Sequence, residues 1–267
     1  MESLIAESSL PWVIFALDES KFAVASTCVE SMLMTPPHVE VPNVDSTIRG
    51  VIQFRNHATP LIDLRARLGM KSRSVEVREF SEMLAAREQD HRNWLTELDA
   101  SATEGRDFTL ATDPHKCAFG KWYDTYEPET YVMKSLLARF DRPHKNIHAI
   151  AAKVRNAQQQ GDLSEAHRIV HECEDHEFNE MINIFAAVKE QFEREHRETT
   201  IVFANNGKFC SIAVDSILTV ETIRPFLEEP KQDELLNLSE NSIIHSLAKQ
   251  QRTEDVVFVV NHENLIA

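Results

Sequence analysis

Two stretches with strand-like composition stand at the ends of this chain, and a helix-like stretch about as long as the two together separates them. Residues 10–72 and 199–267 carry short apolar runs between turn-forming residues, a pattern that predicts β-strands. Residues 73–198 repeat apolar side chains at intervals of three and four, which predicts helices. Because each flank holds only a few short strands, neither can enclose a core alone. We therefore predict one β domain interrupted by a helical bundle, with three tandem units as the alternative.

The predicted strands follow apolar runs in both flanks. In the first flank they are Trp12–Leu17, Phe22–Ala25, Val51–Phe54 and Thr59–Leu64, and in the second they are Thr200–Ala204, Phe209–Val214 and Val256–Val260. The last two strands of the first flank are predicted to pair with each other. Asn205-Asn206-Gly207-Lys208 is typical of a tight hairpin turn, so it predicts that the runs on either side of it also pair.

Three helices are predicted between the flanks. The apolar residues that define them are Phe80, Leu84, Trp94 and Leu98 in the first, Met133, Leu137, Phe140, Ile147, Ala151 and Val154 in the second, and Phe178, Met181, Phe185, Val188 and Phe192 in the third. Gly161-Asp162 is a turn signal that separates the second helix from the third. An even-numbered up-and-down bundle starts and ends on one side, so it can be inserted into a loop of another domain.

Composition excludes several classes of function. The chain has 28 basic and 43 acidic residues, a net charge of −15, which argues against a nucleic-acid binder. Only six glycines occur, and neither GxxxxGK nor GxGxxG is present, so a glycine-cradled nucleotide site is not expected. No apolar run approaches the roughly 20 residues of a membrane span, and the first residues lack the basic start of a secretory signal. We therefore expect a cytoplasmic protein without direct membrane insertion or a disulfide framework.

Three histidines of the helical segment share the predicted apolar faces. His144 and His148 are four residues apart, so both rings project from one side of a helix, and that side carries its apolar stripe. His91 lies in phase with the apolar residues of the first helix. Buried imidazoles are costly unless their nitrogens find partners, and one metal ion would provide a partner for all three.

Cys117 offers a fourth ligand from a different part of the chain. It lies at a helix break, in a segment with glycine and aromatic residues close by, Cys117-Ala-Phe-Gly-Lys-Trp-Tyr123. Three imidazole nitrogens and one thiolate suit tetrahedral zinc. Asp90, Asp113 and Asp141 lie near the proposed ligands in sequence and are candidates to orient their rings from outside.

Other ligand sets remain open at this stage. A histidine on an apolar face is commonly a hydrogen-bonded core residue, and HxxxH is a weak motif. A second HxxxH, His167–His171, is followed by Cys173 and His176, and His115 is the histidine nearest to Cys117 in sequence. His115, His167 or His171 could therefore take the place of a proposed ligand.

The spacing of His91, Cys117, His144 and His148, together with the Cys-x-x-Gly-x-Trp core, resembles the chemoreceptor zinc-binding (CZB) domain. The resemblance covers most of residues 80–195. It implies that these four residues bind Zn²⁺.

The flanks resemble the CheW-like domain of chemotaxis adaptors. Ile48–Arg55 followed by Thr59–Arg65 is similar to that family's GxxNLRG…PxxDLR stretch, and Ala213–Ile217 is similar to its VDxV strand. Gln53 replaces the usual asparagine, and Asn56 stands where a glycine is expected. The resemblance implies an α+β fold: a double SH3-like β-barrel built from both flanks, with the zinc-binding antiparallel four-helix bundle inserted.

Together the two resemblances imply a cytoplasmic signal-transduction adaptor rather than an enzyme. Its partners would be a CheA-type histidine kinase and the cytoplasmic tips of chemoreceptors, and a homodimer through the helical bundle is left open. Arg55, Asp63 and Arg65, charged residues at predicted strand ends, are expected to be exposed and to contact a partner, although ordinary solvated turn residues are the alternative.

The inserted domain would sense zinc or an oxidant such as hypochlorous acid through a zinc-bound Cys117. A purely structural zinc and a zinc hydrolase are the alternatives. Four protein ligands would leave no open position on the ion, and Lys145 stands where an HExxH hydrolase has its glutamate, so the sequence disfavours the hydrolase.

Overall fold

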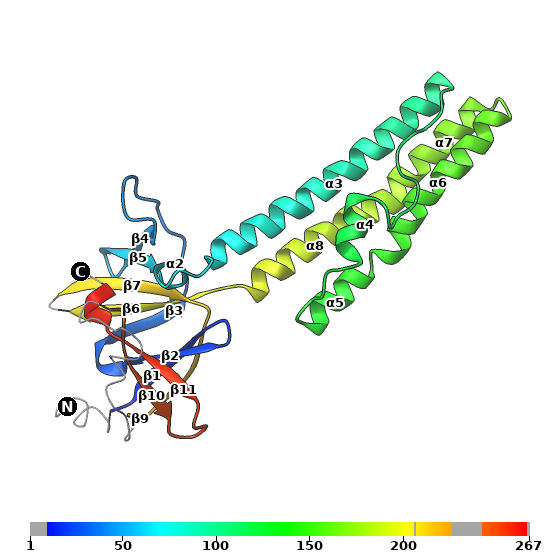
Figure 1. Ribbon diagram of the computed structural model, residues 1–267. Helices are drawn as coiled ribbons and strands as arrows, with labels where there is room; N and C mark the ends of the chain where they lie inside the picture. The colour runs from blue at the N-terminus through cyan, green and yellow to red at the C-terminus, as the bar shows by residue number, and fades with distance from the viewer. Residues whose placement is uncertain (1–9, 206, 226–241, 266–267) are drawn as a thin grey trace. The chain divides into compact units, whose positions relative to one another are not determined.

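The computed structural model describes residues 10–205, 207–225 and 242–265 (Figure 1). The chain divides into two compact units, which we call the β unit and the helical unit. The β unit joins Met1–Val75 to His196–Ala267, and the helical unit is Glu76–Glu195. The predicted α+β class, with a β domain built from both flanks and a helical insertion, is therefore confirmed.

The described strands of the β unit form one six-stranded and one five-stranded sheet. The six-stranded sheet has the order β8 (Ser216–Glu221), β1 (Trp12–Leu17), β2 (Ser20–Ala25), β11 (Val256–Val260), β10 (Ile244–Gln250), β9 (Ile223–Pro225). The five-stranded sheet has the order β3 (Val29–Met34), β6 (Thr199–Asn205), β7 (Lys208–Val214), β5 (His57–Asp63), β4 (Ile48–Phe54). Short helical turns η1 (Ser26–Cys28), α2 (Leu64–Arg67) and η3 (His262–Leu265) lie between or after strands.

Each sheet takes strands from both flanks of the chain. In the first, β1 pairs with β8 antiparallel and β2 pairs with β11 parallel. In the second, β3 pairs with β6 antiparallel and β5 pairs with β7 parallel. Phe15 and Phe22 share one core with Phe203 and Ile212, so apolar residues of both flanks are buried together. Neither flank could satisfy its strand edges or bury its apolar faces without the other.

The predicted strand pairs β4–β5 and β6–β7 are both present. At the β4–β5 turn Arg55 and Asn56 have φ values of 45° and 66°, the left-handed conformations of a tight hairpin turn. Asparagine tolerates this conformation better than most residues. Asn56 in place of glycine therefore leaves the tight turn intact.

The stretch Ala213–Ile217 does not form a single strand. It is divided at Asp215, because β7 ends at Val214 and β8 begins at Ser216 in the other sheet. The Asp215 carboxylate accepts a hydrogen bond from the backbone N–H of Asp18 at 2.8 Å. The chain thus passes from one sheet to the other at a polar residue.

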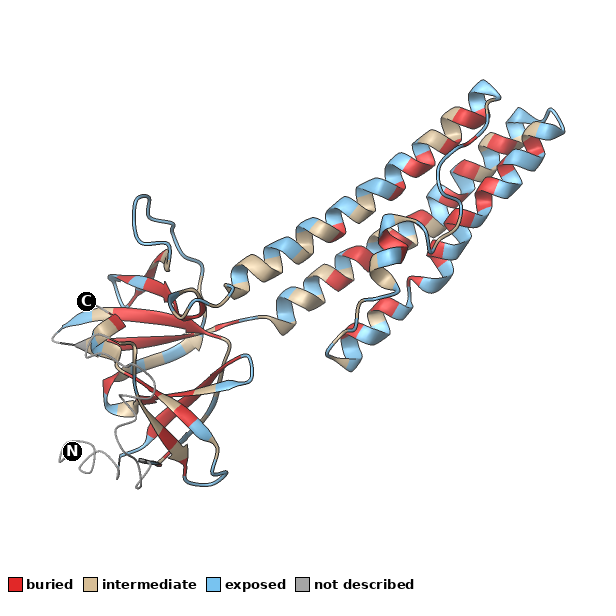
Figure 2. Ribbon diagram, in the orientation of Figure 1, coloured by how far each residue is buried: buried red, intermediate tan, exposed pale blue. Residues whose placement is uncertain are grey.

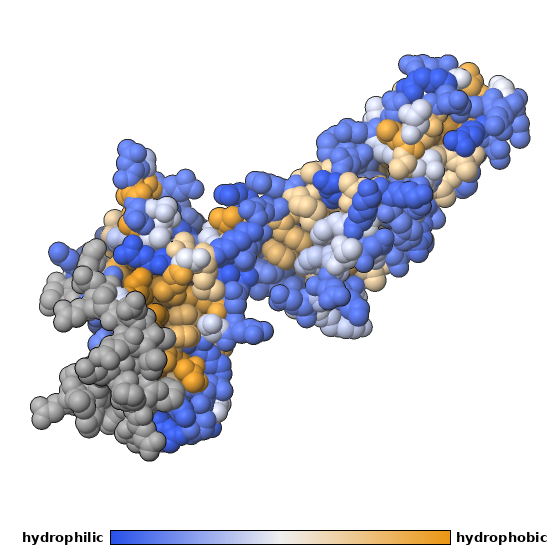
Figure 3. All heavy atoms as spheres, viewed as in Figure 1, coloured by the Kyte–Doolittle hydropathy of each residue, from blue (hydrophilic) through white to orange (hydrophobic). Residues whose placement is uncertain are grey.

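The helical unit contains long helices that bury one side each. Its elements are α3 (Arg73–Glu104), whose first residues belong to the β unit, α4 (Ala118–Tyr123), α5 (Tyr131–Ala138), α6 (Asp141–Gln159), α7 (Leu163–Cys173), the π-helical turn η2 (Glu174–Phe178) and α8 (Asn179–Glu195). In Figure 2 buried residues recur along one side of the long helices. In the view of Figure 3 most of the outer surface of these helices is hydrophilic, as the acidic composition requires.

The predicted second helix is wrong in one respect, because two helices occupy its length. α5 ends at Ala138, and α6 begins at Asp141. Pro143 lies in the first turn of α6, where its missing N–H breaks no bond. In an uninterrupted helix the same proline would face the Arg139 carbonyl without a donor, so the chain restarts instead.

The third helical region is longer than the periodicity indicates. It starts at α7 directly after Gly161-Asp162, and Asp162 caps it by accepting a hydrogen bond from the Glu165 N–H at 2.9 Å. The turn η2 then joins α7 to α8. A π-helical turn takes an extra residue, so Cys173 and Phe178, five residues apart, both lie in the core of the helical unit.

Candidate metal centre

The structure brings His91, Cys117, His144 and His148 together; we call them the four-residue cluster. His91 lies on α3, Cys117 is the N-cap of α4, and His144 and His148 lie one turn apart on α6. One potential ligand atom from each residue lies within 4.8 Å of those of the other three. Three segments that are distant in the chain therefore meet at one point inside the helical unit.

The distances within the four-residue cluster fit a shared ion. Cys117 Sγ lies 3.2 Å from His144 Nε2 and 4.0 Å from His91 Nε2. Tetrahedral zinc with its usual bond lengths separates sulfur from nitrogen by about 3.6 Å. The two observed distances lie on either side of that value, so small side-chain adjustments would complete the tetrahedron.

His148 gives the clearest sign that a partner is needed. Its side chain is buried, and neither ring nitrogen makes a hydrogen bond of good geometry among the described residues, although the Ala111 backbone acts on the ring and opposes the fall in its pKa. The ring contacts those of Trp94, His91 and His144, with centroids 5.0, 5.7 and 4.9 Å away. A buried imidazole whose nitrogens are this poorly paired carries a desolvation cost. A metal ion between the histidines would offset it.

The three imidazoles are held in the neutral form that binds metals. Burial, with His91 and His148 close by, lowers the pKa of His144 to about 3. Burial and His91 lower the pKa of His148 to about 4, and burial also lowers the pKa of His91. At neutral pH the rings therefore offer lone pairs without first losing a proton.

Cys117 is positioned by the start of α4. Its Sγ accepts a hydrogen bond from the Gly120 N–H at 3.1 Å and lies 3.3 Å from the Pro114 carbonyl, to which the thiol can donate. Burial raises the pKa of the thiol, while the N–H groups of Gly120 and Phe119 oppose that rise. The thiolate therefore needs a neighbouring cation to be the main form at neutral pH.

The glycine three residues after Cys117, Gly120, is required by the backbone that packs against it. A Cβ at this position would lie 1.8 Å from the Pro114 carbonyl oxygen, far inside contact distance. Only glycine lets the loop before Cys117 fold back against α4. Phe119, on the same turn, packs edge-on against the rings of His91 and His144. The local motif thus shapes the pocket as well as supplying the sulfur.

A backbone carbonyl orients His91. Its Nδ1 donates to the Arg87 carbonyl at 2.8 Å, which leaves the Nε2 lone pair facing Cys117. An orienting role for Asp90, Asp113 or Asp141 stays a prediction. The three carboxylates have other partners: Asp90 pairs with Arg87, Asp113 accepts from the His115 N–H, and Asp141 accepts from Tyr123.

The rival histidines lie outside the four-residue cluster. His115 is exposed, and its Nδ1 lies 2.9 Å from Asp124. His167 and His171 lie with Asp99 in a separate group. Cys173, which follows them, is buried in the core of the helical unit. The sequence offered these residues as alternatives because spacing alone does not show which helices face each other.

We expect the metal-free helical unit to lose stability as the pH falls below 6.5. Unfolded histidines take up protons near that pH, whereas the folded unit keeps His144 neutral to about pH 3 and His148 to about pH 4. As the pH falls, each such ring lowers the free energy of unfolding by up to about 1.4 kcal/mol per pH unit. The effect ends when the pH reaches the pKa that the ring has in the folded protein. Urea unfolding of chelator-treated protein at a series of pH values measures the slope.

The matched control removes the titrating rings. The double variant His144→Leu and His148→Leu keeps apolar volume at both sites, so its free energy of unfolding should depend less on pH. Equal slopes for this variant and the wild type would contradict the assignment of the two low pKa values.

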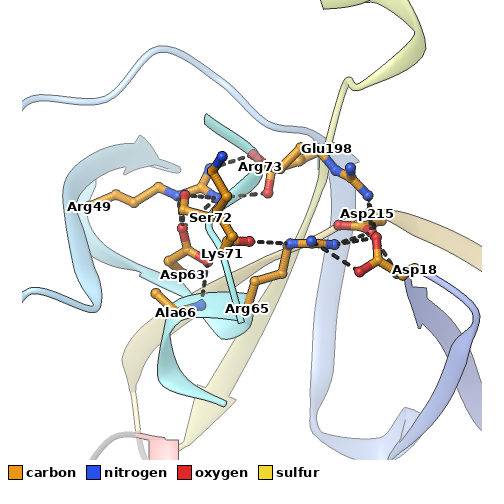
Figure 4. Close-up of polar contacts among 10 residues, drawn as sticks. All are labelled: Asp18, Arg49, Asp63, Arg65, Ala66, Lys71, Ser72, Arg73, Glu198 and Asp215. Carbon is orange, nitrogen blue, oxygen red and sulfur yellow. Dashed lines mark hydrogen bonds and ion pairs between the residues drawn. The ribbon is translucent and has the colours of Figure 1, made fainter. Parts of the chain in front are cut away.

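The β unit contains a charged network, which also corrects a prediction. Asp63 and Arg65 are not exposed: each residue is 2% accessible. As Figure 4 shows, they belong to a network formed by Asp18, Arg49, Asp63, Arg65, Arg73, Glu198 and Asp215. Charged residues at strand ends look solvated in a sequence, but here the two sheets and the start of α3 enclose them.

Arg49 is the centre of one half of the charged network. Its Nε donates to Asp63 at 2.8 Å, and its Nη2 donates to Glu198 at 2.7 Å. Asp63 also accepts from the Ala66 N–H at 3.0 Å and from Ser72. Burial opposes ionisation of Asp63, but the bonds from Ser72, Ala66 and Arg49 lower its pKa overall. The sequence analysis did not select Arg49 or Glu198 as members of a buried ion-pair network. The available signal was Arg49 itself, an arginine inside an otherwise apolar strand.

Arg65 is the centre of the other half. Its Nη1 donates to Asp18 and to Asp215, each at 2.8 Å, and its Nε donates to the Lys71 carbonyl at 2.7 Å. Arg73, the first residue of α3, donates to the same two carboxylates at 2.8 and 2.7 Å. Of the three predicted partner-binding residues, only Arg55 is exposed, and it pairs with Glu30.

We expect Arg49→Met to destabilise the β unit strongly. The substitution leaves the buried carboxylates of Asp63 and Glu198 without their main cation, which costs about 3–5 kcal/mol. Arg55→Met is the control, because an exposed ion pair contributes less than about 1 kcal/mol. Hydrogen exchange of β5 and β6 measures the local free energy of unfolding. Similar values for both variants would contradict a structural role of the charged network.

Comparison with known families agrees with the two parts of the molecule. Residues 11–92 match the CheW-like domain, and residues 91–155 match the chemoreceptor zinc-binding domain. The resemblances predicted from the motifs are therefore confirmed. The second match contains all four residues of the cluster. The first covers the strands of the N-terminal flank, with which strands of the C-terminal flank pair in both sheets.

A solved structure and two negative findings complete the comparison. The crystal structure of the scaffolding protein TtCheW from Thermoanaerobacter tengcongensis is similar to the chain, with 11% identity and a TM-score of 0.39; the match covers 95% of this chain and 84% of that one. No curated protein matches the chain. Among the described residues, no helix combines the length and the apolar character that a membrane crossing needs.

Proposed function

We propose that this protein is a cytoplasmic chemotaxis adaptor whose β unit couples chemoreceptors to a CheA-type histidine kinase and whose helical unit binds Zn²⁺. One observation carries the proposal: a single chain combines a CheW-like match with a buried three-histidine, one-cysteine cluster inside a match to the chemoreceptor zinc-binding domain. The β unit supplies the docking function, and the helical unit supplies the signal.

The four-residue cluster fits zinc better than other common ions. Three neutral imidazoles and one sulfur are borderline and soft ligands, which exclude magnesium and calcium as preferred ions. His91, Cys117, His144 and His148 would hold the zinc, and the ion would supply the positive charge that keeps Cys117 as thiolate. With four protein ligands the ion has no open position, and Lys145 offers no carboxylate base, so we propose no enzymatic activity.

Cys117 is the thiol best placed to sense an oxidant. Cys28, Cys173 and Cys210 are buried, whereas Cys117 is partly exposed. Hypochlorous acid would convert the thiolate to sulfenic acid and chloride: sulfur gives up two electrons and gains a hydroxyl group, and chlorine takes up the electrons. The product is a poorer ligand. The ion would then be held by three histidines alone and would no longer link them to Cys117. The helices that carry these residues would repack.

The route from the helical unit to the docking domain passes through the charged network. α3 begins at Arg73, which bonds Asp18 and Asp215, and the returning chain passes Glu198, which bonds Arg49. Both connections of the insert are therefore tied to charged side chains of the β unit. A change in either connection would alter these ion pairs.

We expect purified full-length protein to bind one zinc ion tightly through the four-residue cluster. Cys117→Ser and His148→Gln each remove one ligand and should weaken binding more than about 100-fold, beyond the effect typical of groups that only support a ligand. Competition with a chromophoric chelator measures the affinity. His115→Ala removes a nearby exposed histidine and is the matched control. Wild-type affinity in Cys117→Ser would rule out the proposed centre.

Oxidant sensing predicts a change in docking. Protein treated with hypochlorous acid, quenched with free methionine and mixed with kinase and receptor-containing membranes should co-sediment several-fold less than untreated protein. Cys117→Ser should show no further loss on treatment, because the reacting sulfur is absent. Equal co-sedimentation of treated and untreated wild type would leave a purely structural zinc as the function of the centre.

A further inference from the structure

A second group of metal-binding side chains lies outside the four-residue cluster. It consists of Asp99 on α3 with His167 and His171 on α7, and we call it the His–Asp group. One potential ligand atom from each residue lies within 4.8 Å of those of the other two. The two histidines are one turn apart on the same face, and their rings are stacked with centroids 6.3 Å apart.

This group is separate from the first centre. Asp99 lies eight residues after His91 on α3, about 12 Å further along the helix axis. The other residues come from α7, whereas the first centre uses α4 and α6. No sulfur takes part, because Cys173 is buried in the core. The two groups could therefore bind ions independently.

The side chains of the His–Asp group are accessible and lie in an acidic environment. Those of Asp99, His167 and His171 are 34%, 35% and 65% exposed, so an ion can reach them from solvent. His171 Nδ1 lies 3.8 Å from Glu174 Oε2. The neighbouring cation, Arg168, is paired with Glu165 and Glu172. The local charge therefore favours a cation.

The present hydrogen bonds already hold His167 in place. Its Nδ1 lies 2.8 Å from Asp99 Oδ1 and its Nε2 lies 3.0 Å from Thr103 Oγ1, so α3 fixes the ring from both sides. Binding an ion would require His167 to give up one of these bonds. Because of that cost, and because it has no thiolate, the His–Asp group should bind a metal ion more weakly than the four-residue cluster.

We propose that Asp99, His167 and His171 form a second, lower-affinity site for a borderline divalent ion such as Zn²⁺ or Cu²⁺, which bridges α3 and α7. Two imidazoles and one carboxylate are the ligand types that these ions accept, and water would complete the coordination. The ion would replace the hydrogen-bonded contact between Asp99 and His167 with a link among three side chains. This site does not depend on the function proposed above.

The test is a metal titration of the chelator-treated full-length protein. With Zn²⁺, calorimetry should give two equivalents per chain, the second weaker than the first. With Co²⁺, the thiolate-to-cobalt absorption band should be complete at the first equivalent, while visible absorption from the metal continues to rise with the second. Asp99→Asn and His171→Ala should lose the second equivalent and retain the thiolate band.

Two further variants make the result decisive. His176→Ala removes an exposed histidine from the same helical stretch and should retain both equivalents. Cys117→Ser should lose the thiolate band and retain the second equivalent, so failure of one site is distinguished from failure of the other. A single equivalent in the wild type, or a second equivalent that survives in both Asp99→Asn and His171→Ala, would overturn the proposal.

Discussion

The buried polar side chains of the helical unit have to be satisfied inside an apolar core, and its functional geometry follows from this constraint. Three imidazoles and one thiol lie among aromatic rings, and neither ring nitrogen of His148 makes a hydrogen bond of good geometry among the described residues. Burial keeps the rings neutral and the thiol protonated. The same desolvation that makes these groups costly without an ion makes them good ligands for one. The four residues could therefore hold a metal ion, which would offset the cost of their burial.

The β unit has to keep its own fold although the helical unit is inserted into its chain. Its sheets close only when strands from both flanks pair, so the chain must return after the insertion. The charged network lies where the chain leaves and returns, at Arg73 and Glu198. Buried ion pairs contribute little net stability, but breaking one is costly. Loss of either Arg49 or Arg65 would therefore deprive carboxylates of this network of a cation.

Much of the fold could be predicted because its signals are local. Short apolar runs marked most of the central strands, and Asn205–Lys208 marked the β6–β7 hairpin. The break between α5 and α6 was missed, although Pro143 is a local signal for it, because the apolar residues on either side keep a helical phase. The strands β3, β8, β9 and β10 were also missed, because polar residues interrupt them and they lie outside the apolar runs that marked the other strands.

The four residues of the candidate centre could be selected from the sequence because their spacing combines a helical HxxxH pair with a cysteine motif. The glycine of that motif is required because a Cβ there would clash with the Pro114 carbonyl. Which other charged residues are buried was decided only by the tertiary structure. Asp63 and Arg65 look exposed at strand ends, yet packing of the two sheets encloses them with Arg49 and Glu198. In the same way, Asp99 meets His167 only because α3 and α7 pack together. Periodicity specifies which face a residue occupies, whereas its partner across the interface depends on how helices and sheets associate, and that information is not local to any segment.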